Sequence, residues 1–116
     1  MPKGTVGRRH KYGAEPTVFD SIRFASRKEA RRYQELRLLE RARRLWGLEV
    51  QPRYPLNVVG GVVKDVVTTI GEYRADFRYI TAGGTVVEDV KGFKTPLYQW
   101  KKKHVEAQYG IQIREI

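Results

Sequence analysis

Acidic residues on two neighbouring predicted strands, with a lysine beside one of them, have the types and spacing to do chemistry. Asp76 lies in the segment YRADFRYI, and Asp89 and Lys91 lie at the end of VVEDVKG. Because side chains alternate along a strand, Asp89 and Lys91 share one face. A short hairpin places Asp76 beside the second strand, where two carboxylates repel each other. A divalent cation offsets this repulsion, since Mg²⁺ is commonly bound by one or two carboxylates.

A cation held between Asp76 and Asp89 predicts hydrolysis of a phosphodiester bond. The metal would polarise a phosphate, lower the pKa of the attacking water and stabilise the departing oxygen. Lys91 would orient the water or counter the charge of the transition state. The metal must be bound through oxygen, because the chain has no cysteine and only two isolated histidines.

The composition predicts a single basic domain with a polyanionic partner. The chain has 116 residues, 41% of them hydrophobic, and a formal net charge of +10. No apolar run approaches the roughly 18 residues of a membrane-spanning helix, and no signal-peptide pattern follows the start. We therefore expect a cytoplasmic protein that binds DNA and no membrane.

Residues 1–14, MPKGTVGRRHKYGA, are predicted to form a basic flexible arm, and residues 15–116 a single domain. TVFDSIRF predicts a small hairpin. Ser26 has N-cap chemistry, and strong helix formers follow it to about Trp46, with Gly47 as the stop. The segments VQPRYPLNVV, VVKDVVTTI, YRADFRYI and TVVEDV predict a meander of strands, in which prolines make the first strand an edge or an irregular entry.

A second helix is predicted for LYQWKKKHVEAQY, with Thr95 as N-cap and Gly110 at its end, and IQIREI follows as a short strand. This order predicts an α/β fold, in which helices flank a central mixed β-sheet that contains an antiparallel meander. In the first helix, Glu29 shares a face with Tyr33 and Leu36 and so points inward. Its alternative role is to complete a capping box with Ser26.

This arrangement resembles the PD-(D/E)XK nuclease superfamily. Its signature is an Asp on one strand, an acidic residue and a Lys separated by one residue on the next, and a Glu on the preceding helix. The matching residues are Asp76, Asp89, Lys91 and Glu29. The resemblance implies a restriction-endonuclease-like fold and a metal bound by Glu29, Asp76, Asp89 and the carbonyl of Val90.

Some details of the signature differ in this chain. Ala75 replaces the signature proline, and Asp89 stands where resolvases usually have Glu. A register shift that makes Glu88 the ligand is the alternative, but it would put Glu88 on the face opposite Lys91. Gln51 stands where some members carry a polar residue near the site, and with Ser26 it is a candidate supporting residue.

Within the superfamily the chain is most similar to archaeal-type Holliday-junction resolvases, and it also resembles small phage proteins. The resemblance implies a homodimeric, Mg²⁺-dependent endonuclease of DNA recombination that cuts four-way junctions, with Mn²⁺ able to substitute. A phage protein of this kind would act in the host cytoplasm. The alternatives are a transposon-end or restriction-type endonuclease of the same fold, and a DNA-binding protein without catalysis, in which Arg74, Arg78 and Lys91 pair with the carboxylates.

Basic residues flanking the predicted site are candidates for phosphate contacts, through which the protein would read DNA shape rather than base edges. They are Arg8, Arg9, Lys11, Lys94, Lys101, Lys102 and Lys103. The alternative for the three consecutive lysines is a solvated helix face.

Overall fold

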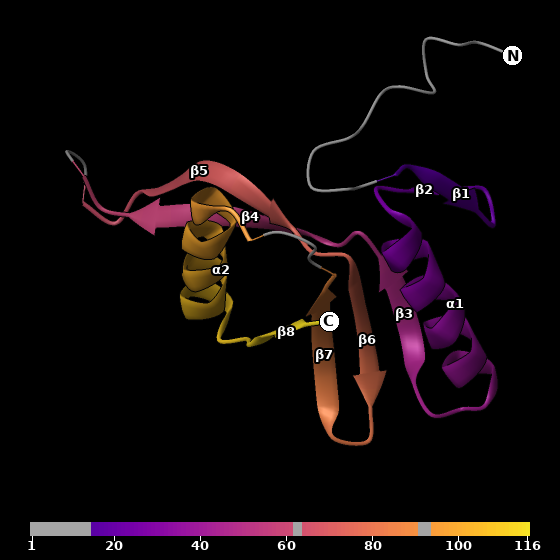
Figure 1. The fold of residues 1–116 in the computed structure, drawn as a ribbon. Coiled ribbons are helices and arrows are strands. Elements are labelled where there is room, and N and C mark those ends of the chain that lie inside the picture. Colours follow the sequence, from indigo (N-terminus) through magenta and orange to yellow (C-terminus); the bar gives the residue numbers. More distant parts are fainter. Residues whose placement is uncertain (1–14, 62–63, 91–93) are drawn as a thin grey trace, which may run out of the picture.

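The computed structural model describes residues 15–61, 64–90 and 94–116, which form two helices and eight strands (Figure 1). None of the helices in this part of the chain is long and apolar enough to cross a membrane. The predicted basic arm, residues 1–14, lies outside the described residues.

The first element is the predicted hairpin, formed by β1 (Thr17–Phe19) and β2 (Ile22–Phe24). The strands pair antiparallel. Asp20 and Ser21 connect them with positive φ angles of 52° and 61°. Two positive φ angles are typical of a tight type I′ turn, whose twist matches that of the strands, so the hairpin prediction is confirmed.

Helix α1 (Arg27–Arg41) starts where the sequence predicts and ends earlier. Ser26 caps it by accepting a hydrogen bond from the backbone N–H of Glu29 at 3.1 Å. The prediction of a helix to about Trp46 is wrong. Arg43 has a left-handed φ of 59°, which turns the chain, and Leu45 is then buried in the core. Gly47 does not cap the helix but lies within the next strand, which begins at Trp46.

The central sheet is mixed and has four strands in the order β3-β6-β7-β8. These are β3 (Trp46–Val50), β6 (Phe77–Thr81), β7 (Gly84–Asp89) and β8 (Ile113–Glu115). The first three pair antiparallel, and β8 pairs parallel with β7. The expected α/β fold with a mixed sheet is therefore confirmed. The predicted meander of consecutive strands is wrong, because two further strands intervene in the sequence between β3 and β6, and only β6 and β7 form a hairpin in this sheet.

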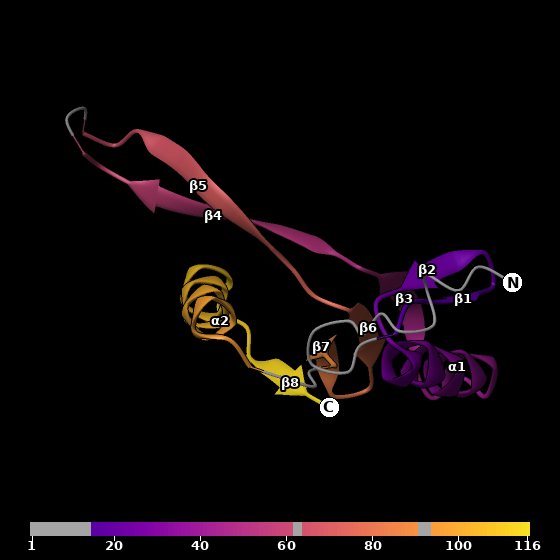
Figure 2. The same cartoon turned by 45° about the horizontal axis from the view of Figure 1, so that its top comes forward.

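Two strands leave this sheet as a separate ribbon. β4 (Arg53–Val59) and β5 (Val67–Arg74) pair only with each other and project away from the sheet (Figure 2). The prediction of one continuous strand through YRADFRYI is wrong, because the chain bends at Ala75 and Asp76. The predicted strand VVKDVVTTI starts later than expected, since Asp65 has a φ of 65° in the turn before β5.

The bend between sheet and ribbon keeps its backbone hydrogen bonds. Ala75 donates to the carbonyl of Pro52 at 3.1 Å, and Gln51 donates to the carbonyl of Asp76 at 2.8 Å. Pro52 has no N–H to donate, and Gln51 has a φ of 55°, so this stretch cannot continue a regular ladder. The predicted irregular entry at the prolines is confirmed, and it places Asp76 at the bend.

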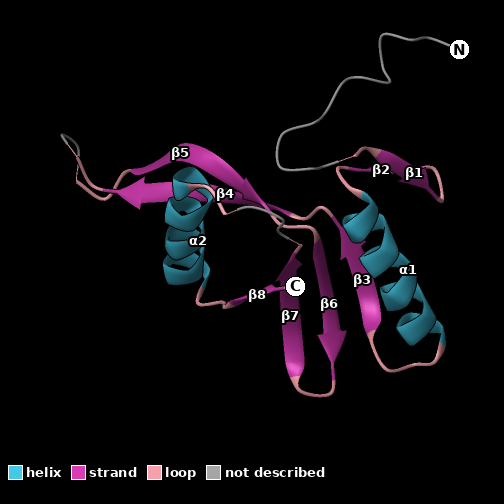
Figure 3. Ribbon diagram, viewed as in Figure 1, coloured by secondary structure: helices cyan, strands magenta, loops and turns pink. Residues whose placement is uncertain are grey.

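The two helices lie apart in the fold (Figure 3), and each contributes to a different core cluster. Helix α1 packs with β1, β2 and β3 around Phe24, Leu36 and Phe77. Helix α2 (Pro96–Tyr109) lies on the ribbon, where Val105 joins a second cluster. As predicted, Thr95 caps α2 and Gly110 ends it with a left-handed φ of 63°.

Candidate active site

Three carboxyl groups from distant parts of the sequence meet at the bend. Glu29 comes from the first turn of α1, Asp76 from the junction of β5 and β6, and Asp89 from the last residue of β7. Asp76 lies close enough to the carboxyl groups of both Glu29 and Asp89 for each of them to shift its pKa. The structure therefore brings together the three acidic side chains that the sequence singles out.

Backbone contacts hold Asp76 in place. Its N–H donates to the carbonyl of Glu88 at 3.0 Å, and its carbonyl accepts from Gln51. Its Oδ2 accepts a hydrogen bond of 2.6 Å from the backbone N–H of Val90. The carboxyl group of Asp76 is thus fixed against the end of β7, one residue beyond Asp89.

Asp89 is fully buried and held by a tyrosine that the sequence analysis did not single out. The hydroxyl of Tyr73 donates to Oδ2 of Asp89. Burial and, next, the negative charge of Asp89 raise the pKa of Tyr73 above its ordinary value, so Tyr73 keeps its proton and remains a donor. Tyr73 comes from the ribbon and Asp89 from the sheet, so only the three-dimensional fold reveals this contact.

The environment of Asp76 disfavours a negative charge. Burial is the largest cause that raises the pKa of Asp76, to about 6, and the negative charge of Glu29 raises it further. Hydrogen bonds with Asp89 and from the N–H of Val90 lower the pKa but offset only part of this rise. A positive charge at this position would relieve the repulsion among the three groups.

The chemistry of these groups fits a divalent cation, although their present arrangement is not that of a metal site. Within residues 15–61, 64–90 and 94–116, no group of three or more Asp, Glu, His or Cys side chains is arranged to hold a metal ion. Glu29 and Asp89 both influence the pKa of Asp76, and Oδ2 of Asp89 already accepts a hydrogen bond from the hydroxyl of Tyr73. All three supply oxygen, the ligand atom that Mg²⁺ prefers. Lys91, the predicted catalytic lysine, lies outside the described residues.

Glu88 lies on the other face of β7 and has a different role. It is fully buried and accepts two hydrogen bonds from the guanidinium of Arg32, at 2.8 and 2.6 Å, and a third from the hydroxyl of Tyr79. This pairing argues against Glu88 as the alternative metal ligand, because its carboxylate is already neutralised within the protein.

A comparison with protein-family models identifies the family. Residues 9–115 match the model described as "Protein of unknown function (DUF1064)". The chain belongs to the DUF1064 family. No curated protein and no solved structure matches this DUF1064 chain in the two other comparisons.

The predicted phosphate-binding residues of this DUF1064 protein differ in whether they already pair with other groups of the protein. Lys94 pairs with Glu115 at 2.9 Å, Lys101 donates to the carbonyl of Glu72 at 2.9 Å, and Lys102 lies 3.8 Å from Glu106. Lys103 is exposed. Arg8, Arg9 and Lys11 lie outside the described residues.

The two supporting residues act through hydrogen bonds near the carboxyl groups. Ser26 caps α1 through the backbone of Glu29 and so fixes the turn that presents Glu29. Gln51 holds the backbone of Asp76, while its side chain donates to the carbonyl of Arg23 at 3.1 Å. Both residues position parts of the site, and the Gln51 amide is engaged with β2.

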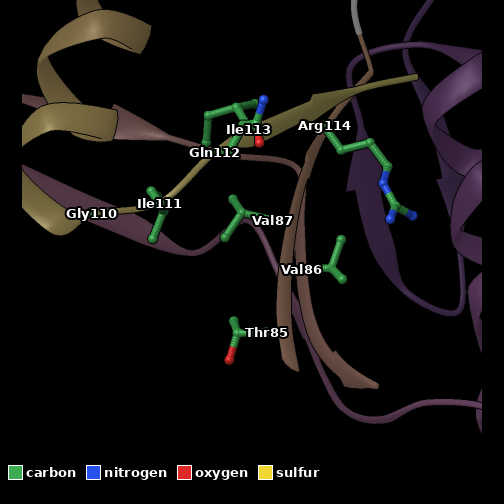
Figure 4. A pocket seen from close by; sticks show the side chains of 8 residues that line it. All are labelled: Thr85, Val86, Val87, Gly110, Ile111, Gln112, Ile113 and Arg114. Atoms are coloured by element: carbon green, nitrogen blue, oxygen red, sulfur yellow. The ribbon is translucent and has the colours of Figure 1, made fainter. Parts of the chain in front are cut away.

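A pocket of the DUF1064 fold lies elsewhere, where the chain leading into β8 diverges from β7 (Figure 4). It has a volume of about 590 Å³. Val86, Val87 and Ile113 line it together with Arg114, and none of the three clustered carboxyl groups does.

The raised pKa of Asp76 predicts a pH dependence of stability. The unfolded chain has the ordinary aspartate pKa of about 4, so between about pH 4 and pH 6 the folded protein binds a proton that the unfolded chain releases. Without metal, the free energy of unfolding should therefore fall as the pH rises through this window, by up to about 3 kcal/mol. Urea unfolding at half-unit pH steps measures this, and Asp76→Asn should flatten the slope. Equal slopes in both proteins would contradict the assigned pKa.

Proposed function

We propose that this protein is a metal-dependent, structure-selective DNA endonuclease that hydrolyses phosphodiester bonds at four-way junctions, as a Holliday-junction resolvase. The observation that carries the proposal is the meeting of Glu29, Asp76 and Asp89, of which two are buried and the third has a raised pKa. The meeting of three acidic groups has no evident structural benefit, because burial and the negative charge of Glu29 oppose the ionisation of Asp76. A bound divalent cation would offset the negative charges of the three carboxylates and so explain why they lie together.

The order of elements supports a restriction-endonuclease-like fold as part of this proposal. A helix carrying Glu29 precedes antiparallel strands, with Asp76 at the bend before β6 and Asp89 at the end of β7, and a second helix and a parallel strand follow. This order is compatible with the one that the resemblance to the PD-(D/E)XK nucleases implies.

In the proposed mechanism Glu29, Asp76, Asp89 and the carbonyl of Val90 would hold Mg²⁺ or Mn²⁺. A cation bound there would supply polarisation of the scissile phosphate and a lower pKa for an attacking water. Asp76 must give up its proton to become a ligand, and the N–H of Val90 keeps its carboxylate oriented. Lys91 would orient the water and offset the charge that develops on the phosphate.

Cutting two opposed strands of a junction requires two active sites, so the proposal includes a two-fold symmetric homodimer. The basic residues would hold the junction arms through their phosphates, since the net charge of +10 attracts polyanions of any sequence. Affinity should then depend on DNA shape and fall steeply with salt.

The proposal predicts metal-dependent cleavage. Purified protein is incubated with a fluorescently labelled four-way junction, a flap and a linear duplex of the same sequence, in Mg²⁺, in Mn²⁺ and in EDTA. We expect paired nicks in the junction with either metal, little cleavage of the duplex, and none in EDTA. Binding of the junction without scission in either metal would contradict the nuclease and favour a DNA-binding protein. Preferred cleavage of one linear sequence would favour a restriction-type enzyme.

A further inference from the structure

Two arginines face each other at the base of the ribbon. Arg53 is the first residue of β4 and Arg74 the last residue of β5, and they are direct partners in the antiparallel register. Both are exposed. Direct cross-strand partners have Cβ atoms about 5 Å apart, at which like charges are destabilising.

Within the part of the chain that the structure describes, these two charges have no carboxylate partner. Among the described residues, neither Arg53 nor Arg74 has an acidic oxygen within 4.0 Å. The neighbouring strands show the usual alternative, because Arg78 lies directly opposite Glu49 and forms two hydrogen bonds with its carboxylate. The Arg53–Arg74 pair instead presents two guanidinium groups, which can donate charge-assisted hydrogen bonds to the phosphate of a bound ligand.

The arginine pair lies next to the carboxyl cluster. Arg74 precedes Asp76 by two residues, and Arg53 follows Gln51 by two residues. The backbone hydrogen bonds from Ala75 to Pro52 and from Gln51 to Asp76 join the same two strands through the bend. Two residues span at most about 7 Å of chain, so the Cα atoms of Arg74 and Asp76, and those of Arg53 and Gln51, lie within about 7 Å of each other.

Buried tyrosines fix the base of the ribbon. Tyr54 and Tyr73, the next register pair, point to the opposite face and are buried, and the ring centroid of Tyr73 lies 6.4 Å from that of Tyr98 on α2. Tyr73 also donates to Asp89, so the residue beside Arg74 binds the carboxyl cluster directly. This contact fixes the backbone of the ribbon base, which carries the arginine pair on its other face, relative to the cluster.

We infer that Arg53 and Arg74 form a clamp for the DNA backbone phosphate adjacent to the one that is cut. This inference rests on the proposed nuclease function and identifies how the substrate strand is positioned at the bend. The clamp binds phosphate oxygens of any sequence, and it acts by positioning, without contacting the reacting atoms.

The clamp is tested with Arg53→Gln, Arg74→Gln and the double variant. Matched controls are Arg41→Gln and Arg44→Gln and their double variant, which remove the same charge near the end of α1; Arg41 lies about 18 Å along that helix from Glu29. Binding of a labelled four-way junction is measured in EDTA by fluorescence anisotropy from 50 to 300 mM salt. We expect each clamp variant to lose about tenfold in affinity and to reduce the salt slope by about 1, and the controls to change affinity less than about threefold.

Thermal unfolding separates a clamp from a structural pair. Removing one charge relieves the repulsion, so the Tm of each single variant at low salt should equal or exceed that of the wild type. Inorganic phosphate should raise the Tm of the wild type more than that of the double variant. A lower Tm with unchanged affinity for the junction would overturn the clamp.

Because binding is measured without metal, the two proposals can fail separately. Clamp variants that bind and cleave the junction like the wild type overturn the clamp and leave the nuclease standing. A wild type that cleaves no DNA, but whose clamp variants lose affinity, overturns the nuclease and supports the arginine pair as a phosphate site.

Discussion

Asp76→Asn should abolish cleavage and at the same time stabilise the metal-free protein. The amide removes one anionic metal ligand, so we expect the rate of junction cleavage to fall by at least about 1,000-fold, or about 4 kcal/mol of transition-state stabilisation. The same change removes a carboxyl group whose ionisation at neutral pH is opposed by burial and by Glu29. The free energy of unfolding in EDTA at pH 7.5 should therefore rise by about 1 to 3 kcal/mol.

Single-turnover cleavage and urea unfolding measure the two effects. Asp65→Asn is the matched control, because it removes one exposed carboxylate in the ribbon turn, where asparagine tolerates the φ of 65°. This control should leave both quantities nearly unchanged. An Asp76→Asn protein that cleaves DNA normally would show that Asp76 is not a ligand. One that loses stability would show that Asp76 is an ionised structural residue.

Arg32→Met should produce the largest loss of stability. Arg32 neutralises the fully buried carboxylate of Glu88 through two hydrogen bonds, and methionine would leave that charge without its partner. Removing one member of a buried ion pair typically costs about 3 to 5 kcal/mol. Arg27→Met, which breaks an exposed pair with Glu15, should cost about 1 kcal/mol or less.

Chemical unfolding of both variants tests this difference, and a double variant tests its cause. Adding Glu88→Leu to Arg32→Met removes the uncompensated charge and should recover most of the lost free energy. The donor Tyr79 then faces an apolar neighbour, so recovery is expected to be incomplete. An Arg32→Met protein as stable as the Arg27→Met protein would contradict the importance of the buried pair.

Local chemistry made much of the fold predictable. Thr95 and Pro96 at the start of α2 and Gly110 at its end fix that helix through its caps, and alternation with a Gly-Gly turn indicates the hairpin of β6 and β7. The end of α1 could not be predicted, because an arginine, Arg43, takes the left-handed conformation that glycine usually signals. The separate ribbon was missed because the break at Ala75 and Asp76 depends on pairing with Gln51 and Pro52, far away in the sequence.

The acidic residues of the site were predictable and their partners were not. The alternation of side chains and the hairpin register place Asp76 near Asp89, and helical periodicity turns Glu29 inward. The contact between Tyr73 and Asp89, by contrast, joins the ribbon to the sheet. The pair of Arg32 and Glu88 joins a helix to a strand 56 residues away, and spacing alone does not indicate such long-range contacts.

The carboxyl groups at the bend should form one binding site for a divalent cation, and Mn²⁺ binding followed by electron paramagnetic resonance tests this most directly. At pH 7.5 the wild type should bind Mn²⁺ with saturable stoichiometry, and Mg²⁺ should displace it. Asp76→Asn and Asp89→Asn should each lose this binding, whereas Asp65→Asn should retain it. Equal Mn²⁺ binding by the wild type and by both site variants would contradict the metal centre and the nuclease proposed from it.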